Sequence, residues 1–152
     1  MNKKKYEVGN TIKLIIDEDT LKNYNEYYFD KYPKRKVPPI TKPTHPSINV
    51  WFIMPRPQMN ALKGKWKDFI VWFVEQEKLS NLNIENCSIE SISYLKTRIR
   101  ADCDNMSPKF IIDGLVEAGL IVDDDYKHVH SLTLKVGYDR DHPRTEILIH
   151  IC

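Results

Sequence analysis

The chain lacks the features of membrane, secreted and disulfide-stabilised proteins. No apolar run approaches the roughly 20 residues of a bilayer-spanning helix. The lysines at the amino terminus are not followed by the apolar segment and cleavage site of a signal peptide. Cys87, Cys103 and Cys152 form neither a metal-type pair nor an even disulfide set. We therefore expect a protein of the reducing cytoplasm that does not associate with membranes.

Several common catalytic motifs are absent as well. The sequence contains no glycine-rich phosphate loop, no serine nucleophile elbow and no dinucleotide fingerprint. His128 and His130 alternate, but zinc needs more ligands nearby. Cys103 lies between two aspartates, which disfavour its thiolate. Nucleotide binding, zinc chemistry and covalent catalysis by serine or cysteine are therefore poor explanations of this sequence.

The length of 152 residues suits one domain with a substantial core. We expect residues 1–152 to form that domain, with a Tyr- and Pro-rich amino-terminal extension at about 19–47. Most of the prolines lie between Pro33 and Pro57, so this segment should be largely extended, with one buried strand near Ile48–Ile53. The segment is either a rigid arm that reaches a partner or substrate, or a plain surface loop.

Hydrophobic periodicity predicts both helices and strands. A strand at Thr11–Ile16 precedes a helix that Asp19 or Thr20 caps. A longer helix spans Gln58–Leu79, because its apolar residues recur on one stripe, with Trp72 outside that stripe.

Alternating apolar residues predict three further strands. These strands are Cys87–Arg100, His130–Val136 and Thr145–Ile151, and residues 137–144 join the last two as a hairpin. The expected fold is therefore α+β, with a small mixed or antiparallel sheet of about four strands packed against two main helices.

The basic residues are clustered along the chain. The formal net charge of +2 is too small to indicate a nucleic-acid partner by itself. Basic patches nevertheless occur at 31–36, 63–67 and 96–100. If the partner is DNA, the candidate phosphate contacts are Lys63, Lys65, Lys67, Arg98 and Arg100. The alternative is that these patches are solvated faces and loops.

Acidic residues follow the strand expected at 87–100. Asp102 and Asp104 lie two residues apart, so they project from the same face if that strand continues. Two carboxylates that close repel each other, and a cation between them removes the penalty. Mg²⁺, with Mn²⁺ as the alternative, prefers such oxygen ligands. The pair therefore predicts a metal site.

A short helix follows these acids. Ser107 before Pro108 predicts the start of the helix, with serine as the N-cap, and Gly119 predicts its end. Lys109 and Asp113 are four residues apart and so are neighbours on its surface. Three aspartates follow at 123–125. The two acidic groups meet only if the chain after Gly119 folds back along the helix.

The order of these residues resembles the signature of the RusA family of Holliday junction resolvases. It runs Asp-x-Asp-Asn, a lysine, an aspartate four residues later, a leucine, Ala-Gly and a paired Asp-Asp, over about a fifth of the chain. The family's resolvases commonly place the lysine three residues after the asparagine, whereas Lys109 stands four after Asn105. The spacing from Lys109 to Asp113 is kept, so we interpret the difference as an insertion at the helix start.

The resemblance implies a small α+β homodimer that cleaves four-way DNA junctions with Mg²⁺ in DNA recombination and repair, commonly in phages or prophages. Asp102, Asp104 and Asp124 would be the catalytic, metal-binding carboxylates. Lys109 would be the catalytic basic residue beside the scissile phosphate. The spacing leaves Asp123 and Asp125 as alternatives to Asp124.

Two other functions fit the same sequence. The first is a catalytically inactive or structural DNA-binding module of the same fold. The second is a protein-interaction domain, in which the segment Tyr24–Tyr32 and the prolines bind another chain and the acids only cap and solvate. Mg²⁺-dependent nicking of a synthetic junction separates the resolvase from the inactive module. Metal titration separates it from the interaction domain, which should bind no ion.

Overall fold

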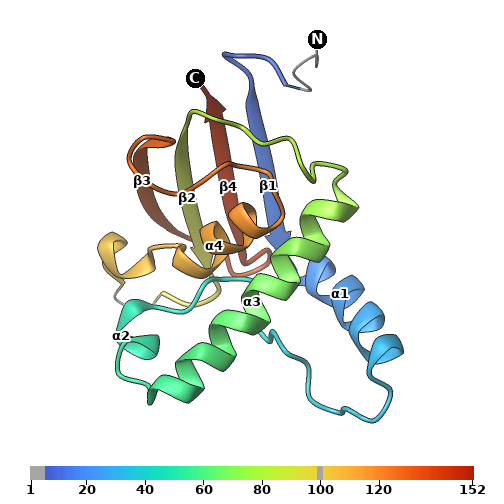
Figure 1. Ribbon diagram of the computed structural model, residues 1–152. Coiled ribbons are helices and arrows are strands. Elements are labelled where there is room, and N and C mark those ends of the chain that lie inside the picture. Colours follow the sequence, from blue (N-terminus) through green and yellow to red (C-terminus); the bar gives the residue numbers. More distant parts are fainter. Residues whose placement is uncertain (1–5, 99–100) are drawn as a thin grey trace.

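The computed structural model describes residues 6–98 and 101–152. Four strands form one mixed sheet, and two helices, α3 (Arg56–Gln76) and α4 (Lys109–Glu117), lie over one of its faces (Figure 1). This arrangement confirms the expected α+β class. Within the described residues, no helix is long and apolar enough to cross a membrane.

The strands follow the spatial order β1-β4-β2-β3. Strand β1 (Thr11–Asp17) pairs antiparallel with β4 (Arg144–Ile151), which pairs antiparallel with β2 (Cys87–Leu95). Strand β3 (Val129–Tyr138) runs parallel to β2 at the edge of the sheet. The strands expected at 11–16, 130–136 and 145–151 are therefore confirmed.

Two expectations about these strands are wrong. The strand expected from residue 87 to 100 ends at Leu95, because its partners end there: Leu95 lies opposite the last residue of β3, Tyr138. The expected β3–β4 hairpin does not form, because β2 lies between the two strands. The link crosses the end of β2, where the Asp139 N–H donates to the Leu95 carbonyl at 2.9 Å. Alternation identifies a strand but not its neighbour.

The first helix, α1 (Glu18–Lys31), begins directly where β1 ends. The residue that caps it is Asp17, and not Asp19 or Thr20 as expected. Asp17 Oδ1 accepts from the Thr20 N–H at 2.9 Å, and Thr20 Oγ1 accepts from the Asp17 N–H at 3.2 Å. This reciprocal capping box makes Thr20 the third residue of the helix.

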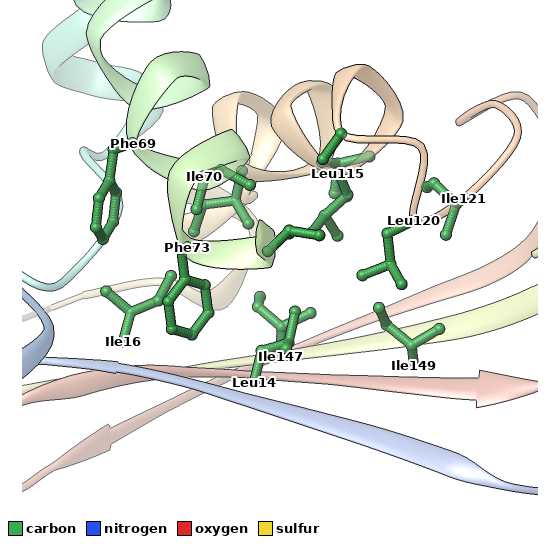
Figure 2. Packing of buried hydrophobic residues seen from close by; sticks show 14 of the residues in the cluster. Leu14, Ile16, Phe69, Ile70, Phe73, Leu115, Leu120, Ile121, Ile147 and Ile149 are labelled. Carbon is green, nitrogen blue, oxygen red and sulfur yellow. The ribbon is translucent and has the colours of Figure 1, made fainter. Parts of the chain in front are cut away.

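The core lies between the sheet and the helices, as Figure 2 shows. Its helical residues include Phe69, Ile70, Phe73 and Leu115, and its strand residues include Leu14, Ile16, Ile147 and Ile149. The predicted helix at 58–79 is confirmed as α3, and its apolar stripe faces this core. Helix α4 approaches α3 closely at Gly114, where a Cβ would lie 2.5 Å from the Ile70 Cβ. This contact fixes the position of α4.

The strand expected near residues 48–53 is absent. Residues Ile48–Trp51 form a short helix, α2, and Ser47 caps it by accepting from the Asn49 N–H at 3.2 Å. Burial was also wrongly expected, because Phe52 and Ile53 are 73% and 80% exposed. Serine therefore starts a helical turn where apolar β-branched residues had indicated a strand.

The preceding residues 33–47, which we call the proline arm, lie against the domain. Ile40 and His45 are buried, and the Pro43 carbonyl accepts from Thr145 Oγ1 at 2.7 Å. The arm is therefore attached to the start of β4 and is not a plain surface loop.

Candidate functional site

The acids before α4 do not lie on a strand. Because β2 ends at Leu95, the expectation that Asp102 and Asp104 share a strand face is wrong. Asp102 is the N-cap residue of a short 3-10 helix, η1 (Cys103–Met106), and its carbonyl accepts from the Asn105 N–H at 3.1 Å. Both aspartates are exposed, and neither side chain has a hydrogen bond or ion pair within the described chain. Their carboxylates are thus open to a cation.

The start of α4 is capped by a residue that sequence reasoning missed. The expected cap, Ser107, is not used, and the N-cap position is held by Pro108, whose side chain cannot accept a hydrogen bond. His45 of the proline arm takes this role, because its Nε2 lies 3.0 Å from the Phe110 backbone N. Its Nδ1 lies 2.8 Å from the Pro46 carbonyl oxygen. No local spacing indicates a cap that is 65 residues distant in sequence.

The buried environment keeps His45 neutral. Only 2% of the residue is exposed, and burial lowers the pKa of the imidazole to about 4. The rings of Trp66 and Phe110 lie with their centroids 5.5 and 5.0 Å from the imidazole centroid. The Phe110 N–H needs an acceptor, so Nε2 is unprotonated and Nδ1 donates to Pro46. This hydrogen bond ties the proline arm to the first turn of α4.

Lys109 joins the two ends of the α4 segment. Its Nζ donates to Asp113 Oδ1 at 2.9 Å and lies 3.4 Å from Asp124 Oδ2. The hydrogen bond that Lys109 donates to Asp113 is the main cause that raises the pKa of Lys109. The expected Lys109–Asp113 contact is confirmed, and the chain after Gly119 folds back so that Asp124 reaches Lys109 at the start of the helix.

The three consecutive aspartates have different partners. Asp123 Oδ1 accepts from the Asp124 N–H at 2.7 Å, and Asp125 Oδ1 accepts from the His128 N–H at 3.2 Å. These two bonds stabilise the local turn. Asp124 is the member of the three that reaches Lys109. Asp124 is thus the one of the three aspartates that contacts the start of α4, which spacing alone could not decide.

The candidate DNA contacts are divided by the structure. Lys63 Nζ lies 3.5 Å from Asp113 Oδ2, and Lys67 Nζ lies 3.5 Å from Glu117 Oε2, so both lysines pair with α4. Lys65 is exposed and makes no ion pair in the part of the chain that the structure describes.

The remaining two candidates follow β2. Arg98 is exposed, with its guanidinium 4.7 Å from the centre of the Tyr138 ring. Arg100 lies outside the described residues. The structure therefore leaves Lys65 and Arg98 as the candidates without a carboxylate partner in the described chain.

A cavity of about 590 Å³ lies beside the acids, and Asp102 and Asn105 contribute to its lining. The proline arm and α3 contribute apolar residues to the lining, including Ile40 and Trp66. Across residues 6–98 and 101–152, no group of three His, Cys, Asp or Glu side chains is arranged to hold a metal. The donor chemistry fits Mg²⁺, because the open groups at this site are carboxylates.

No protein-family model matches the chain, and a search of curated proteins gives no match. The function must therefore be argued from the site itself.

Proposed function

We propose that the chain is a RusA-type, Mg²⁺-dependent endodeoxyribonuclease that cleaves four-way DNA junctions. The observation that carries the proposal is the contact of Lys109 with both Asp113 and Asp124. It brings Asp124, which follows α4, to the lysine at the start of that helix, and the segment that carries Asp102 and Asp104 directly precedes the helix in the chain. An exposed lysine among carboxylates suits a phosphodiester substrate, whose negative charge grows during cleavage.

Each residue then has a defined role. Asp102, Asp104 and Asp124 would hold the ion, which when bound supplies an activated water and neutralises charge on the phosphate. Lys109 contacts a phosphate oxygen, and its flexible stem lets the ammonium leave Asp124 when that carboxylate takes a cation. Asp113 positions Lys109, because their 2.9 Å hydrogen bond lies within one helix and does not depend on Asp124.

DNA binding in this proposal depends on charge. Lys65, Arg98 and Arg100 contact backbone phosphates, so binding weakens steeply as the salt concentration rises. Paired cuts in opposed strands need two sites, and a homodimer supplies them. The enzyme would act in the cytoplasm, on branched DNA formed during recombination and repair.

A specific observation favours a second function, which is a DNA-binding module of the same fold without cleavage. Asp124 is already paired with Lys109, and no ready-made cluster of three metal-binding side chains occurs in the described residues. In that case the same basic residues would bind junctions, and Mg²⁺ would not lead to nicking.

Nicking of a synthetic four-way junction in Mg²⁺ decides between the two functions. Asp102→Asn should abolish cleavage and leave junction binding largely intact, because one charged metal ligand is lost and no basic residue is changed. Asp141→Asn is the matched control, since its side chain is 95% exposed in the loop between β3 and β4. Binding without nicking by the unaltered protein would favour the inactive module. If linear duplex DNA were cleaved as fast as the four-way junction, the proposed specificity for junctions would be wrong.

A further inference from the structure

A second cavity is lined mainly by residues of α1 and α3, two helices that point in different directions in Figure 1. It has a volume of about 560 Å³, and we call it the α1–α3 cleft. Four basic residues contribute to its lining: Lys31, Arg35, Lys65 and Lys67. Asp102 and Asp104 are not in the lining, so the cleft is distinct from the candidate nuclease site.

Of these four cations, one makes an ion pair within the described residues. Lys67 pairs with Glu117 at 3.5 Å. Lys31, Arg35 and Lys65 make no ion pair with a carboxylate in the described residues, and all three are exposed. The wall that residues 24–35 form contains cations but no carboxylate. These side chains therefore present charge that an anion can neutralise.

Aromatic rings lie directly beneath Lys31 and Arg35. Arg35 stacks over the Tyr32 ring at 4.2 Å, and its Nη1 donates to the Tyr28 hydroxyl at 2.6 Å. Tyr27 and Tyr32 are 42% and 37% exposed, so part of each ring is available for contact. Tyr27 also stacks on Trp72, with ring centroids 6.0 Å apart and planes 29° apart. The rings are thus held in place before any ligand binds.

We propose that the α1–α3 cleft binds single-stranded DNA. Phosphates contact Lys31, Arg35 and Lys65, and bases stack on the exposed rings of Tyr27 and Tyr32. The strand must be unpaired, because bases inside a duplex already cover each other's faces. Asp68 and Glu75 also border the cleft and lower its net charge, so the affinity depends on the rings as well as on the cations. This binding does not require cleavage or a metal.

The test is binding of fluorescein-labelled oligothymidylate, followed by fluorescence anisotropy in EDTA over a range of salt concentrations. The variant Lys31→Gln/Arg35→Gln removes two phosphate contacts from exposed side chains. The slope of log affinity against log salt should become shallower by about 1.4, or about 0.7 for each contact. Tyr27→Ser should weaken binding about tenfold through lost stacking. Thermal unfolding of each variant confirms that it is folded.

Lys22→Gln/Lys78→Gln is the matched control, because it removes the same charge from exposed lysines outside the cleft lining. A slope that changes equally in both double variants would overturn the proposal. So would the absence of binding to the unaltered protein, or displacement of the oligonucleotide by polyglutamate at equal charge concentration, which would indicate a protein partner. All these measurements are made without Mg²⁺, so they remain separate from the outcome of the junction-nicking assay.

Discussion

The two flanks of α3 differ in how they use basic residues. On the α4 flank, Lys63 and Lys67 pair with Asp113 and Glu117. On the α1 flank, Lys65 has no carboxylate partner in the described residues and borders the α1–α3 cleft, which the Lys67–Glu117 pair also borders. Residues four apart share a helix face, and the residue between them points elsewhere. A single basic run in the sequence therefore contributes both to ion pairs with α4 and to the lining of an open cleft.

The same contrast applies to packing. The α4 flank includes the close approach at Gly114 and the buried His45, whereas the α1 flank includes partly exposed rings above which cations lie. We expect substitutions on the α4 flank to change stability. Substitutions on the α1 flank should instead change binding.

The largest stability effect should come from acidification at His45. The folded-state pKa of about 4 lies below the ordinary value of 6.5, so the unfolded chain takes up a proton first as the pH falls. The contribution of neutral His45 to the free energy of unfolding is complete above pH 6.5 and is lost progressively toward pH 4. It amounts to about 3 kcal/mol. His45→Leu should lose this pH dependence, as well as about 1 kcal/mol at neutral pH, because the Phe110 N–H lacks its acceptor. Urea denaturation between pH 4 and pH 6.5 measures both effects. Equal pH dependence of the free energy of unfolding in the two proteins would contradict the role of His45 as a buried, neutral cap.

Replacing two helical glycines by alanine should change the stability of the protein in opposite directions. Gly114→Ala should destabilise the protein by about 2 kcal/mol, because the new Cβ would meet Ile70 at 2.5 Å. Gly64→Ala should stabilise it by about 1 kcal/mol, because nothing lies within 4 Å of its new Cβ and alanine favours the helix. Thermal and urea unfolding provide the comparison. Similar effects at both positions would mean that the α4 flank is not closely packed.

The smallest stability effects should come from the lysines. Lys63→Met should cost about 0.5 kcal/mol, because Asp113 keeps Lys109 as a second cation and surface ion pairs contribute little. Lys65→Met should leave the free energy of unfolding unchanged and should weaken single-strand binding. A larger loss of stability for Lys65→Met would place Lys65 in the internal packing instead.

The sequence predicted what depends on local patterns. The stripe of α3 and the alternation of β4 are strong enough to locate both elements, and the Lys109–Asp113 contact follows from helix geometry. The β3–β4 hairpin and the Ser107 cap were wrong because tertiary contacts decided them. The strand at 48–53 was wrong because a local cap, Ser47, starts a helical turn there. Strand order depends on how β2 inserts between β3 and β4. The cap of α4 depends on an imidazole carried by the proline arm, 65 residues away.

The most direct test compares two lysines that share one carboxylate. Lys109 and Lys63 both pair with Asp113, yet only Lys109 has a proposed role in cleavage. Single-turnover cleavage of a four-way junction in Mg²⁺ should slow about 100-fold or more in Lys109→Met, with junction binding retained. Lys63→Met should cleave at a rate close to that of the unaltered protein. Equal loss in both variants, or no loss in Lys109→Met, would contradict the account.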